Sequence, residues 1–360
     1  MPEAQSRRHF LGTVTAASLA TTAAALPRTA AAATTNLAVG SIGHSITHFP
    51  LFVAAQLGYF RRNGVDIGTV TEFSTGSLVD TAVTAGSLDV GSSVITDVFA
   101  LAKAGRSVKI LSAAMNAYYV DVVASKSFLA ATKLTARSSL ADKIRALRGK
   151  NIGITGPGSG TAALVLFLLK GGNIDRTRDV QLINVGANIP AVLAALQAGR
   201  VDLVSFAWPL AQQAQVQGIG EALISPARGD IPAMNHELQG VVYTTQDEID
   251  RKHVPMAGFV RGYAAACTTI RTDAARSRKL LTAFYPNLDR KALDLTFALY
   301  RATSVPSSPL PDRSGFARAV AFHRSVGLIT ENYRYDDLVA TQLISEALRR
   351  AAGEADARGE

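Results

Sequence analysis

Two short segments of this chain, 113 residues apart, have nearly the same sequence. Residues 85–90 and 198–203 share the pattern Ala-Gly-x-(Leu/Val)-Asp-(Val/Leu), and each follows a helical pattern. The elements around each copy also have the same order: strand, helix, strand, helix and short strand. Such alternation predicts an α/β fold with mostly parallel sheets covered by helices. Two matching halves predict two sheets, and a single larger sheet with an accidental repeat is the alternative.

Local signals in the first half place its elements. An apolar run at 37–40 predicts a buried strand, and residues 64–70 predict a second one. Pro50 opens a helical pattern that stops at Gly58, as expected from the preferences of these residues for helix starts and ends. Ser77 is a candidate N-cap for the next helix.

The second half repeats these signals. Residues 150–155 predict a strand that enters a glycine-rich turn at 156–161, and a helix follows to Lys170. Residues 180–185 predict the next strand, and Asn188 is placed to cap the helix after it. Asp89 and Asp202 recur with the repeat, so we expect them to have structural roles.

Composition narrows the class of protein. The 360 residues are 48% hydrophobic and 18% charged, which is enough to build the cores of two domains. The net charge of +9 is dispersed, and basic spots such as 143–148 and 276–279 fit solvated helix faces, so no nucleic acid partner is expected. Cys267 is the sole cysteine, which excludes an internal disulfide and a cysteine-based metal site. We expect a buried thiol, no metal and no cofactor.

The N-terminal residues resemble an export signal. Arg7 and Arg8 precede a weakly apolar stretch at 11–26 and an alanine-rich end at 27–33. This order predicts a twin-arginine signal peptide over residues 1–33, with a poorly ordered N-terminal helix as the alternative. No cysteine lies near the cleavage region, so we expect a periplasmic protein without a lipid anchor.

Further motifs extend over nearly all of the chain after this signal, and one of them reads Ala-Ala-Gln-Leu-Gly-Tyr-Phe-Arg-Arg-Asn-Gly-Val-Asp-Ile. In sequence order, the motifs occupy residues 54–67, 85–91, 147–154, 198–209 and 326–339. Together they resemble the nitrate/sulfonate/taurine-type substrate-binding proteins of ABC transporters, a family that includes relatives named after the thiamine-pyrimidine synthase.

The resemblance implies a type-II periplasmic binding protein fold, with two α/β lobes, a ligand cleft between them and a double-crossing hinge. Lobe 1 would comprise 34–123 and 240–360, and lobe 2 would comprise 124–239, with crossings near 120–124 and 238–243. The implied function is capture of a small organic solute, anionic or aromatic, for an ABC permease in the inner membrane. The expected binding protein is a monomer and not an enzyme.

Candidate ligand-binding residues lie in the loops that would face this cleft. Lobe 1 contributes Ser45, Thr47, His48, Gly76, Ser77, Ser92 and Ser93. Lobe 2 and the first crossing contribute Tyr118, Gly158, Ser159, Gly160, Thr161, Asn188 and Trp208. The turn at 156–161 is the strongest candidate, because its glycines expose backbone N–H groups at a helix N-terminus, where anions bind. Helix capping, or core packing for Trp208, is the alternative for the others.

Other functions have less support in the sequence. The glycine turn lacks the Gly-Lys-Ser/Thr of a nucleotide-binding loop and the glycine spacing of a dinucleotide fingerprint. No hydrolytic triad, zinc motif or carboxylate pair stands out. A ligand-sensing partner of a membrane receptor and an exported enzyme on the same fold are the alternatives. The solute itself is left open between a carboxylate or sulfonate and a neutral aromatic or heterocycle.

Overall fold

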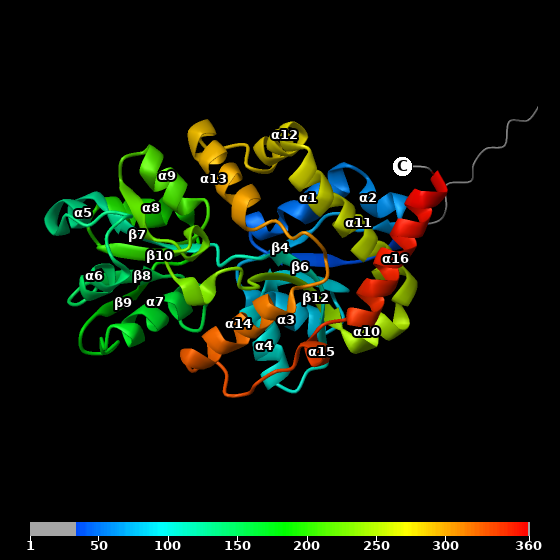
Figure 1. Cartoon of the computed structure of the whole chain (residues 1–360), viewed down its shortest axis with the longest axis horizontal. Helices are drawn as coiled ribbons and strands as arrows, with labels where there is room; N and C mark the ends of the chain where they lie inside the picture. Colours follow the sequence, from blue (N-terminus) through cyan, green and yellow to red (C-terminus); the bar gives the residue numbers. More distant parts are fainter. Residues whose placement is uncertain (1–33, 359–360) are drawn as a thin grey trace, which may run out of the picture. The chain divides into compact units, whose positions relative to one another are not determined.

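The computed structural model describes residues 34–358, with side chains to residue 353, and Figure 1 shows the arrangement of its elements. The signal peptide expected over residues 1–33 lies outside the described residues. The described strands form two five-stranded sheets and a short two-stranded ladder of β1 (Thr35–Asn36) and β3 (Val65–Asp66). The expected α/β architecture with two sheets is therefore confirmed.

The first sheet has the strand order β4-β2-β5-β12-β6. Its strands are β2 (Val39–Ile42), β4 (Thr71–Phe73), β5 (Val90–Val94), β6 (Val108–Met115) and β12 (Gly240–Thr245). Strand β2 runs parallel to both β4 and β5, whereas β12 is antiparallel to β5 and β6.

The second sheet has the strand order β11-β7-β10-β8-β9. Its strands are β7 (Val120–Ser125), β8 (Asn151–Ile154), β9 (Gln181–Asn184), β10 (Leu203–Ala207) and β11 (Gly220–Ile224). Strand β8 is parallel to β9 and β10, and β7 is antiparallel to β10 and β11. The two sheets therefore have the same plan, in which β2 corresponds to β8 and β12 corresponds to β7.

The chain passes between the sheets twice. It leaves the first sheet after Met115 and enters the second at Val120, and it leaves after Ile224 and returns at Gly240. Each crossing delivers the one strand of its new sheet that is antiparallel to its neighbours. The two crossings meet where the Gln239 N–H donates to the Met115 carbonyl at 3.0 Å.

The helices lie between and after these strands. The first half contains α1 (Phe49–Gln56), α2 (Tyr59–Arg62), α3 (Gly76–Thr84) and α4 (Ile95–Lys103). The second half contains α5 (Lys126–Thr132), α6 (Leu140–Arg145), α7 (Gly160–Gly171), α8 (Ile189–Gln197) and α9 (Leu210–Val216), which gather around the second sheet in Figure 1. The C-terminal part contains α10 (Gln246–Arg251), α11 (His253–Thr272), α12 (Ala274–Phe284), α13 (Arg290–Thr303), α14 (Arg313–Ser325), α15 (Tyr335–Leu338) and α16 (Thr341–Arg358).

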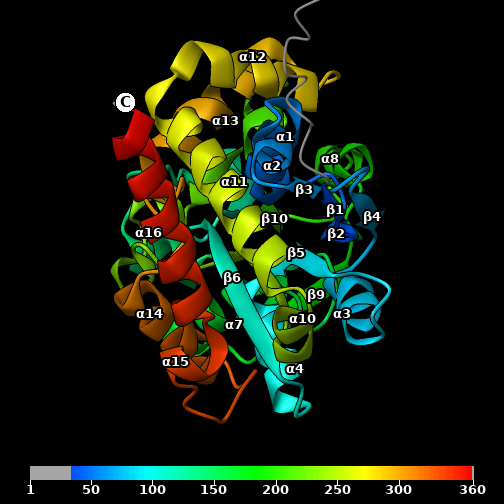
Figure 2. The same ribbon diagram turned by 90° about the vertical axis from the view of Figure 1, so that its right-hand side faces the viewer.

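Strand alternation accounts for the cores. Successive residues of a strand point to opposite faces, and Val122 joins the apolar cluster of α7 while Val123 joins that of α8. The first sheet shares its core with the C-terminal helices, and α16 packs along α11 (Figure 2). No helix in the described part of the chain is both long enough and apolar enough to cross a membrane.

The two recurring aspartates make equivalent hydrogen bonds in the two halves of the chain. The Ala38 N–H donates to Asp89 Oδ2 at 2.8 Å, and the Asn151 N–H donates to Asp202 Oδ2 at 2.9 Å. In both halves the partners are 51 residues apart, so the same bond ties the start of the first strand to the entry of the third. The structural roles expected for these aspartates are confirmed.

Two local expectations were wrong. Within the strand expected over 64–70 only β3 is a strand, because Gly68 has a φ of 53° and turns the chain, and the next strand, β4, begins at Thr71. Helix α3 begins at Gly76 with Thr75 in the N-cap position, so Ser77 lies inside the first turn. Ser159 and Asn188, in contrast, cap α7 and α8 by accepting from the N–H groups of Ala162 and Ala191.

Candidate functional site

The loop after β2 holds its polar side chains in a buried network. His48 Nε2 lies 2.9 Å from the Ile42 carbonyl, which can only accept, so we assign the proton to Nε2. His48 Nδ1 then accepts from the Ser92 hydroxyl at 2.8 Å. Burial lowers the pKa of His48 to about 4, so the ring is neutral at pH 7. Thr47 donates to Ser45 Oγ at 3.1 Å in the same network. Both ring nitrogens are satisfied within the protein, so His48 stabilises the loop.

A carboxyl group lies beside this network. Ser93 donates to the Asp97 carboxylate, and a Cβ on Gly76 would overlap that carboxylate, so only glycine fits there. Burial, followed by the nearby Asp80 carboxylate, raises the pKa of Asp97 to about 7. Asp97 is half-buried in the first turn of α4. Gly76 and Ser93 are therefore organised around Asp97.

The glycine turn before α7 uses its own hydroxyl groups. Ser159 donates to the Gly156 carbonyl at 2.7 Å, and Thr161 Oγ1 accepts from the Thr155 N–H at 2.9 Å. Gly158 has a φ of 76°, in the left-handed region that favours glycine. The turn thus presents backbone groups, rather than free hydroxyls, to whatever lies beside it.

Both crossings approach this turn. The Tyr118 hydroxyl donates to the Gly160 carbonyl at 2.5 Å. A Cβ on Gly160 would lie 3.3 Å from Gln239 Nε2 and 3.4 Å from Tyr118 Oη. The start of α7, the first crossing and the second crossing therefore meet at Gly160.

Trp208 is fixed to the first crossing. Its backbone N–H donates to the Tyr119 carbonyl at 3.1 Å, and its indole N–H donates to Asp121 Oδ2 at 2.9 Å. The Tyr119 and Trp208 rings are edge-to-face with centroids 6.5 Å apart. Burial raises the pKa of Asp121 to about 7. Trp208 is 2% exposed, so it closes over the crossing rather than facing solvent.

Buried polar atoms without a partner gather in the same region. Among the described residues, fourteen buried side-chain nitrogen and oxygen atoms have no hydrogen-bond partner in the protein. Eight of them belong to six residues on the second sheet, on α9 or on the crossing back: Asp121, Ser205, Gln212, Ser225, Glu237 and Gln239. Buried polar groups are nearly always bonded, so this concentration makes the region a candidate binding site. We call Tyr118, Asp121, Gly160, Trp208, Glu237 and Gln239 the crossing site.

The predicted residues are only partly brought together. Tyr118, Gly160 and Trp208 belong to the crossing site, and Ser159 and Thr161 shape the adjoining turn. Ser77 and Asn188 are exposed and follow the edge strands β4 and β9, so they lie apart from it. The sequence prediction missed Asp121, Glu237 and Gln239. The sequence feature that could have identified them is a polar residue inside or beside an apolar run.

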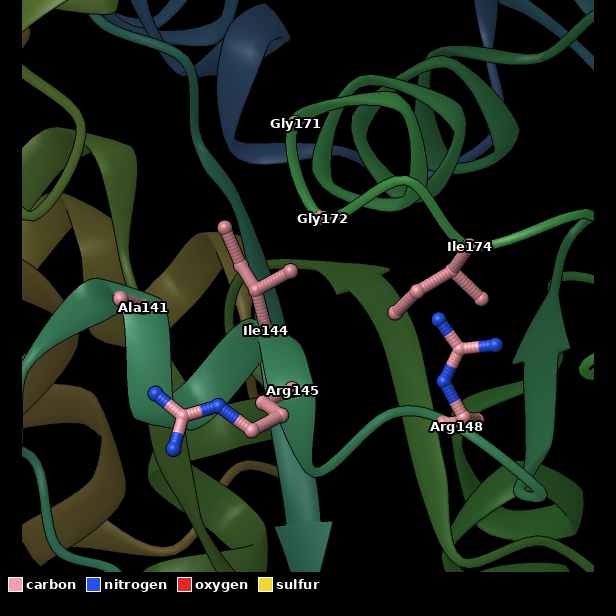
Figure 3. Close-up of a pocket in the computed structure, with 7 residues that line it drawn as sticks. All are labelled: Ala141, Ile144, Arg145, Arg148, Gly171, Gly172 and Ile174. Atoms are coloured by element: carbon pink, nitrogen blue, oxygen red, sulfur yellow. The ribbon is translucent and has the colours of Figure 1, made fainter.

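A separate hollow lies on the second half of the chain. It has a volume of about 170 Å³ and is lined by residues of α6 and the end of α7 (Figure 3). Its two arginines are paired, Arg145 with Asp142 and Arg148 with Asp179. The hollow contains none of the predicted ligand-binding residues, so we do not assign it to the site.

The structure shows whether a reactive cysteine thiol or a metal-binding cluster is present among the described residues. Cys267 lies in the core on α11, and burial raises the pKa of its thiol to about 12, so the thiolate is not available at pH 7. Within residues 34–353, no three His, Cys, Asp or Glu side chains are close enough together to hold a metal ion.

The two repeated sheets and the double crossing define a binding-protein fold, and comparison with known proteins agrees. The profile of the NMT1-like family matches residues 30–283, most of the chain, and the protein belongs to that family. Its fold is similar to the ligand-binding component of an ABC-type import system from Staphylococcus aureus, at a TM-score of 0.68 and 17% identity over 87% of this chain and 98% of that one.

Two other solved structures have the same fold. The alkanesulfonate-binding protein SsuA from Xanthomonas axonopodis pv. citri, bound to MOPS, has a TM-score of 0.63 and 18% identity over 88% of this chain and 99% of that one. The periplasmic nitrate-binding protein NrtA from Synechocystis PCC 6803 has a TM-score of 0.65 and 12% identity over 88% and 89%. Comparison with curated protein sequences finds no match. The predicted family resemblance and fold class are thus confirmed.

Proposed function

We propose that this protein is the solute-binding component of an ABC importer and that it captures a small organic molecule at the crossing site. The observation that carries the proposal is the concentration of unpartnered buried polar atoms around Asp121, Glu237 and Gln239. Such atoms are costly unless something bonds to them. Family membership supports the same function, because the similar structures include binding components of import systems for several solutes.

Binding requires movement in this proposal. Trp208 is 2% exposed and Gln239 is fully buried, so a solute reaches them only if the two halves separate. The two crossings, after Met115 and before Gly240, are the connections about which the halves would rotate. We propose the two lobes as the moving units, lobe 1 from 34–123 and 240–360 and lobe 2 from 124–239, with the first boundary moved to the crossing at 116–119 because β7 is a strand of the second sheet.

The location and partners of the protein complete the proposal. Arg7 and Arg8 support export to the periplasm by the twin-arginine route, and the absence of cysteine near residues 27–33 supports a form without a lipid anchor. The proposed partner is an ABC permease in the inner membrane, and the proposed binding protein is a monomer. Replacing both arginines by lysine should leave the protein in the cytoplasm, and an undiminished periplasmic level would contradict this route.

Sensing and catalysis are the competing functions. A sensing partner would use the same crossing site but would be recovered with a receptor rather than with a permease. An enzyme would need a reactive group, and two candidates are engaged or inaccessible: His48 is bonded at both nitrogens and Cys267 is buried. Solute binding accounts for the crossing site without a further requirement.

A thermal-shift screen of small organic solutes tests the proposal. A ligand at 100 times its Kd adds about 2.7 kcal/mol to the free energy of unfolding, which is readily detected. A true solute should also reduce the radius of gyration in solution scattering, and Gly160→Val should abolish both effects while the variant stays folded. A broad library without a single stabilising compound would contradict solute binding. A strong ligand that binds Gly160→Val as tightly as the parent would show that the binding site lies elsewhere in the protein.

A further inference from the structure

Two carboxyl groups belong to the crossing site, Asp121 and Glu237, and Asp97 lies near Tyr119 beside it. None of the three forms an ion pair in the described part of the chain, although the charge of Arg228 reaches Asp121 and partly offsets the rise in pKa that burial causes there. Asp121 Oδ2 accepts from the Trp208 indole and Asp121 Oδ1 is unpartnered, as are both oxygens of Glu237. Asp97 accepts from Ser93. From this arrangement we infer that the solute carries a positively charged or N–H-rich group, such as an amine, an amidine or an aminoheterocycle. The inference rests on the proposed function and names its class of solute.

The other buried acids show that the arrangement is unusual in this protein. Asp89 pairs with Lys252 at 2.5 Å, and Glu248 pairs with Arg251. Asp230 likewise pairs with Arg228 at 2.6 Å. A buried acid is stable only when it is paired or hydrogen-bonded. These acids have a cation, whereas Asp80 accepts from the Tyr243 hydroxyl and Asp202 accepts from the Asn151 N–H. Glu237 has neither kind of partner, and burial raises its pKa well above its usual range. The acids of the crossing site lack that cation, and a bound solute would provide it.

The three acids lie around one short stretch of chain. Burial, followed by the nearby Glu237 carboxylate, raises the pKa of Tyr118 well above its usual range. Burial, with a contribution from nearby Asp97, raises the pKa of Tyr119 to about 12. Trp208 bonds to both Tyr119 and Asp121. The segment 118–121 therefore lies near the Glu237 and Asp97 carboxyl groups and carries the Asp121 carboxyl group itself. One small solute could therefore contact more than one of them.

The chemistry of the remaining lining groups agrees with this class of solute. The unpartnered oxygen atoms at the site are Asp121 Oδ1, Glu237 Oε1 and Oε2, and Gln239 Oε1, with Gln239 Nε2 as the unpartnered donor. These carboxyl and amide oxygens accept from the N–H groups of a solute, and a cationic solute would also favour the ionised form of Glu237, whose pKa burial raises well above its usual range. Of the solutes that the sequence left open, this class disfavours the carboxylate or sulfonate and is compatible with a heterocycle.

The test is a binding comparison of charge-matched probes with the full-length mature protein. Each probe pair shares a skeleton and differs in charge, for example benzamidine with benzoate, and phenethylamine with 3-phenylpropionate. We expect stabilising compounds among the cationic members, each binding at least tenfold tighter than its anionic counterpart. Glu237→Gln should weaken the best cationic probe tenfold or more in titration calorimetry. Glu221→Gln makes the same chemical change at an exposed position of the second sheet and should bind as the parent does.

The outcomes separate this inference from the proposed function. Tighter binding of the anionic members, or undiminished cation binding by Glu237→Gln, would overturn the inference while leaving solute binding intact. No stabilisation by any compound of either charge would count against solute binding itself and the inference with it. If Glu237→Gln fails to fold, Asp97→Asn replaces it, because this half-buried side chain can lose its charge with little change in packing.

Discussion

The two halves of the molecule keep one backbone frame and place different chemistry in it. Asp89 and Asp202 make the same bond to the start of their sheets, and Gly86 and Gly199 turn the chain at equivalent positions with φ values of 74° and 68°. The side chains that face the loops are not repeated. A few repeated residues are therefore enough to maintain the shared backbone arrangement, and the positions between them can differ and form a binding site.

The clearest difference is an acid pair. Asp80 and Asp97 lie near each other in the first half, and the positions 113 residues later are Leu193 and Leu210. The Tyr243 hydroxyl donates to Asp80 Oδ1 at 2.5 Å. The first half thus places titratable groups beside the crossing, whereas the second half has apolar side chains there and offers the backbone of the glycine turn.

The repeated aspartates give the largest expected effect. Asp89→Ala and Asp202→Ala each remove a charge-assisted hydrogen bond, and we expect each to lower the free energy of unfolding by about 1.5–3 kcal/mol. Asp89 also pairs with the partly exposed Lys252, which adds ~0.2–1 kcal/mol to its cost. Urea unfolding measures both variants. A negligible effect of either one would mean that its bond does not hold the frame.

The acid pair predicts a pH dependence that Asp97→Asn removes from the first half. Asp97 has a folded-state pKa of about 7 against a usual value of 3.8, so its stabilising proton is kept at low pH and is lost as the pH rises through 7. Asp97→Asn should therefore gain stability relative to the parent between pH 5 and pH 8, on the order of 1–2 kcal/mol after allowing for its partial exposure. His48 and His323 act oppositely, with pKa values lowered to about 4, but they are unchanged in the variant.

The quantity to compare is the difference in free energy of unfolding between Asp97→Asn and the parent. The two histidines contribute equally to both proteins, so their contributions cancel in this difference. The titratable or polar groups near Asp97 include Asp80, Ser93, Tyr119 and Tyr243. The pKa of Asp80 moves in the same direction, because burial raises it to about 6. Parallel stability curves for variant and parent from pH 5 to pH 8 would contradict the shifted pKa.

The helix caps predict the smallest effect. Asn188 accepts from the Ala191 N–H at 3.0 Å, whereas Thr75, its counterpart 113 residues earlier, makes no such bond. Asn188→Ala should lower the free energy of unfolding by about 1 kcal/mol, and Thr75→Ala by a few tenths. Equal losses for the two variants would show that both caps act alike in solution.

The frame could be predicted from the sequence, and the crossing site only in part. The repeat, the strand at 180–185 and the cap at Asn188 follow from short-range patterns, and the structure has them. Trp208 and Gly160 were found because a lone tryptophan and a glycine turn are conspicuous in any sequence. These signals depend on local chemistry, which a sequence displays directly.

Asp121 and Glu237 could not be found in the same way. Each is a single acid in or beside an apolar run, and such acids are usually paired or exposed. What distinguishes them is the partner that they lack, and this depends on contacts such as that of Asp121 with Trp208, 87 residues away. A sequence does not show which acidic side chains have no cationic side chain nearby after the two crossings have packed together.

The emission of Trp208 tests the central claim most directly, because Trp208 is the only tryptophan of the chain and lies within the crossing site. The measurement is a fluorescence titration of the mature protein with a stabilising solute from the screen. The account predicts a saturable change in emission with the same Kd as calorimetry, and weaker binding by Trp208→Phe. An unchanged emission, together with full affinity in Trp208→Phe, would show that the solute binds elsewhere and would contradict the account.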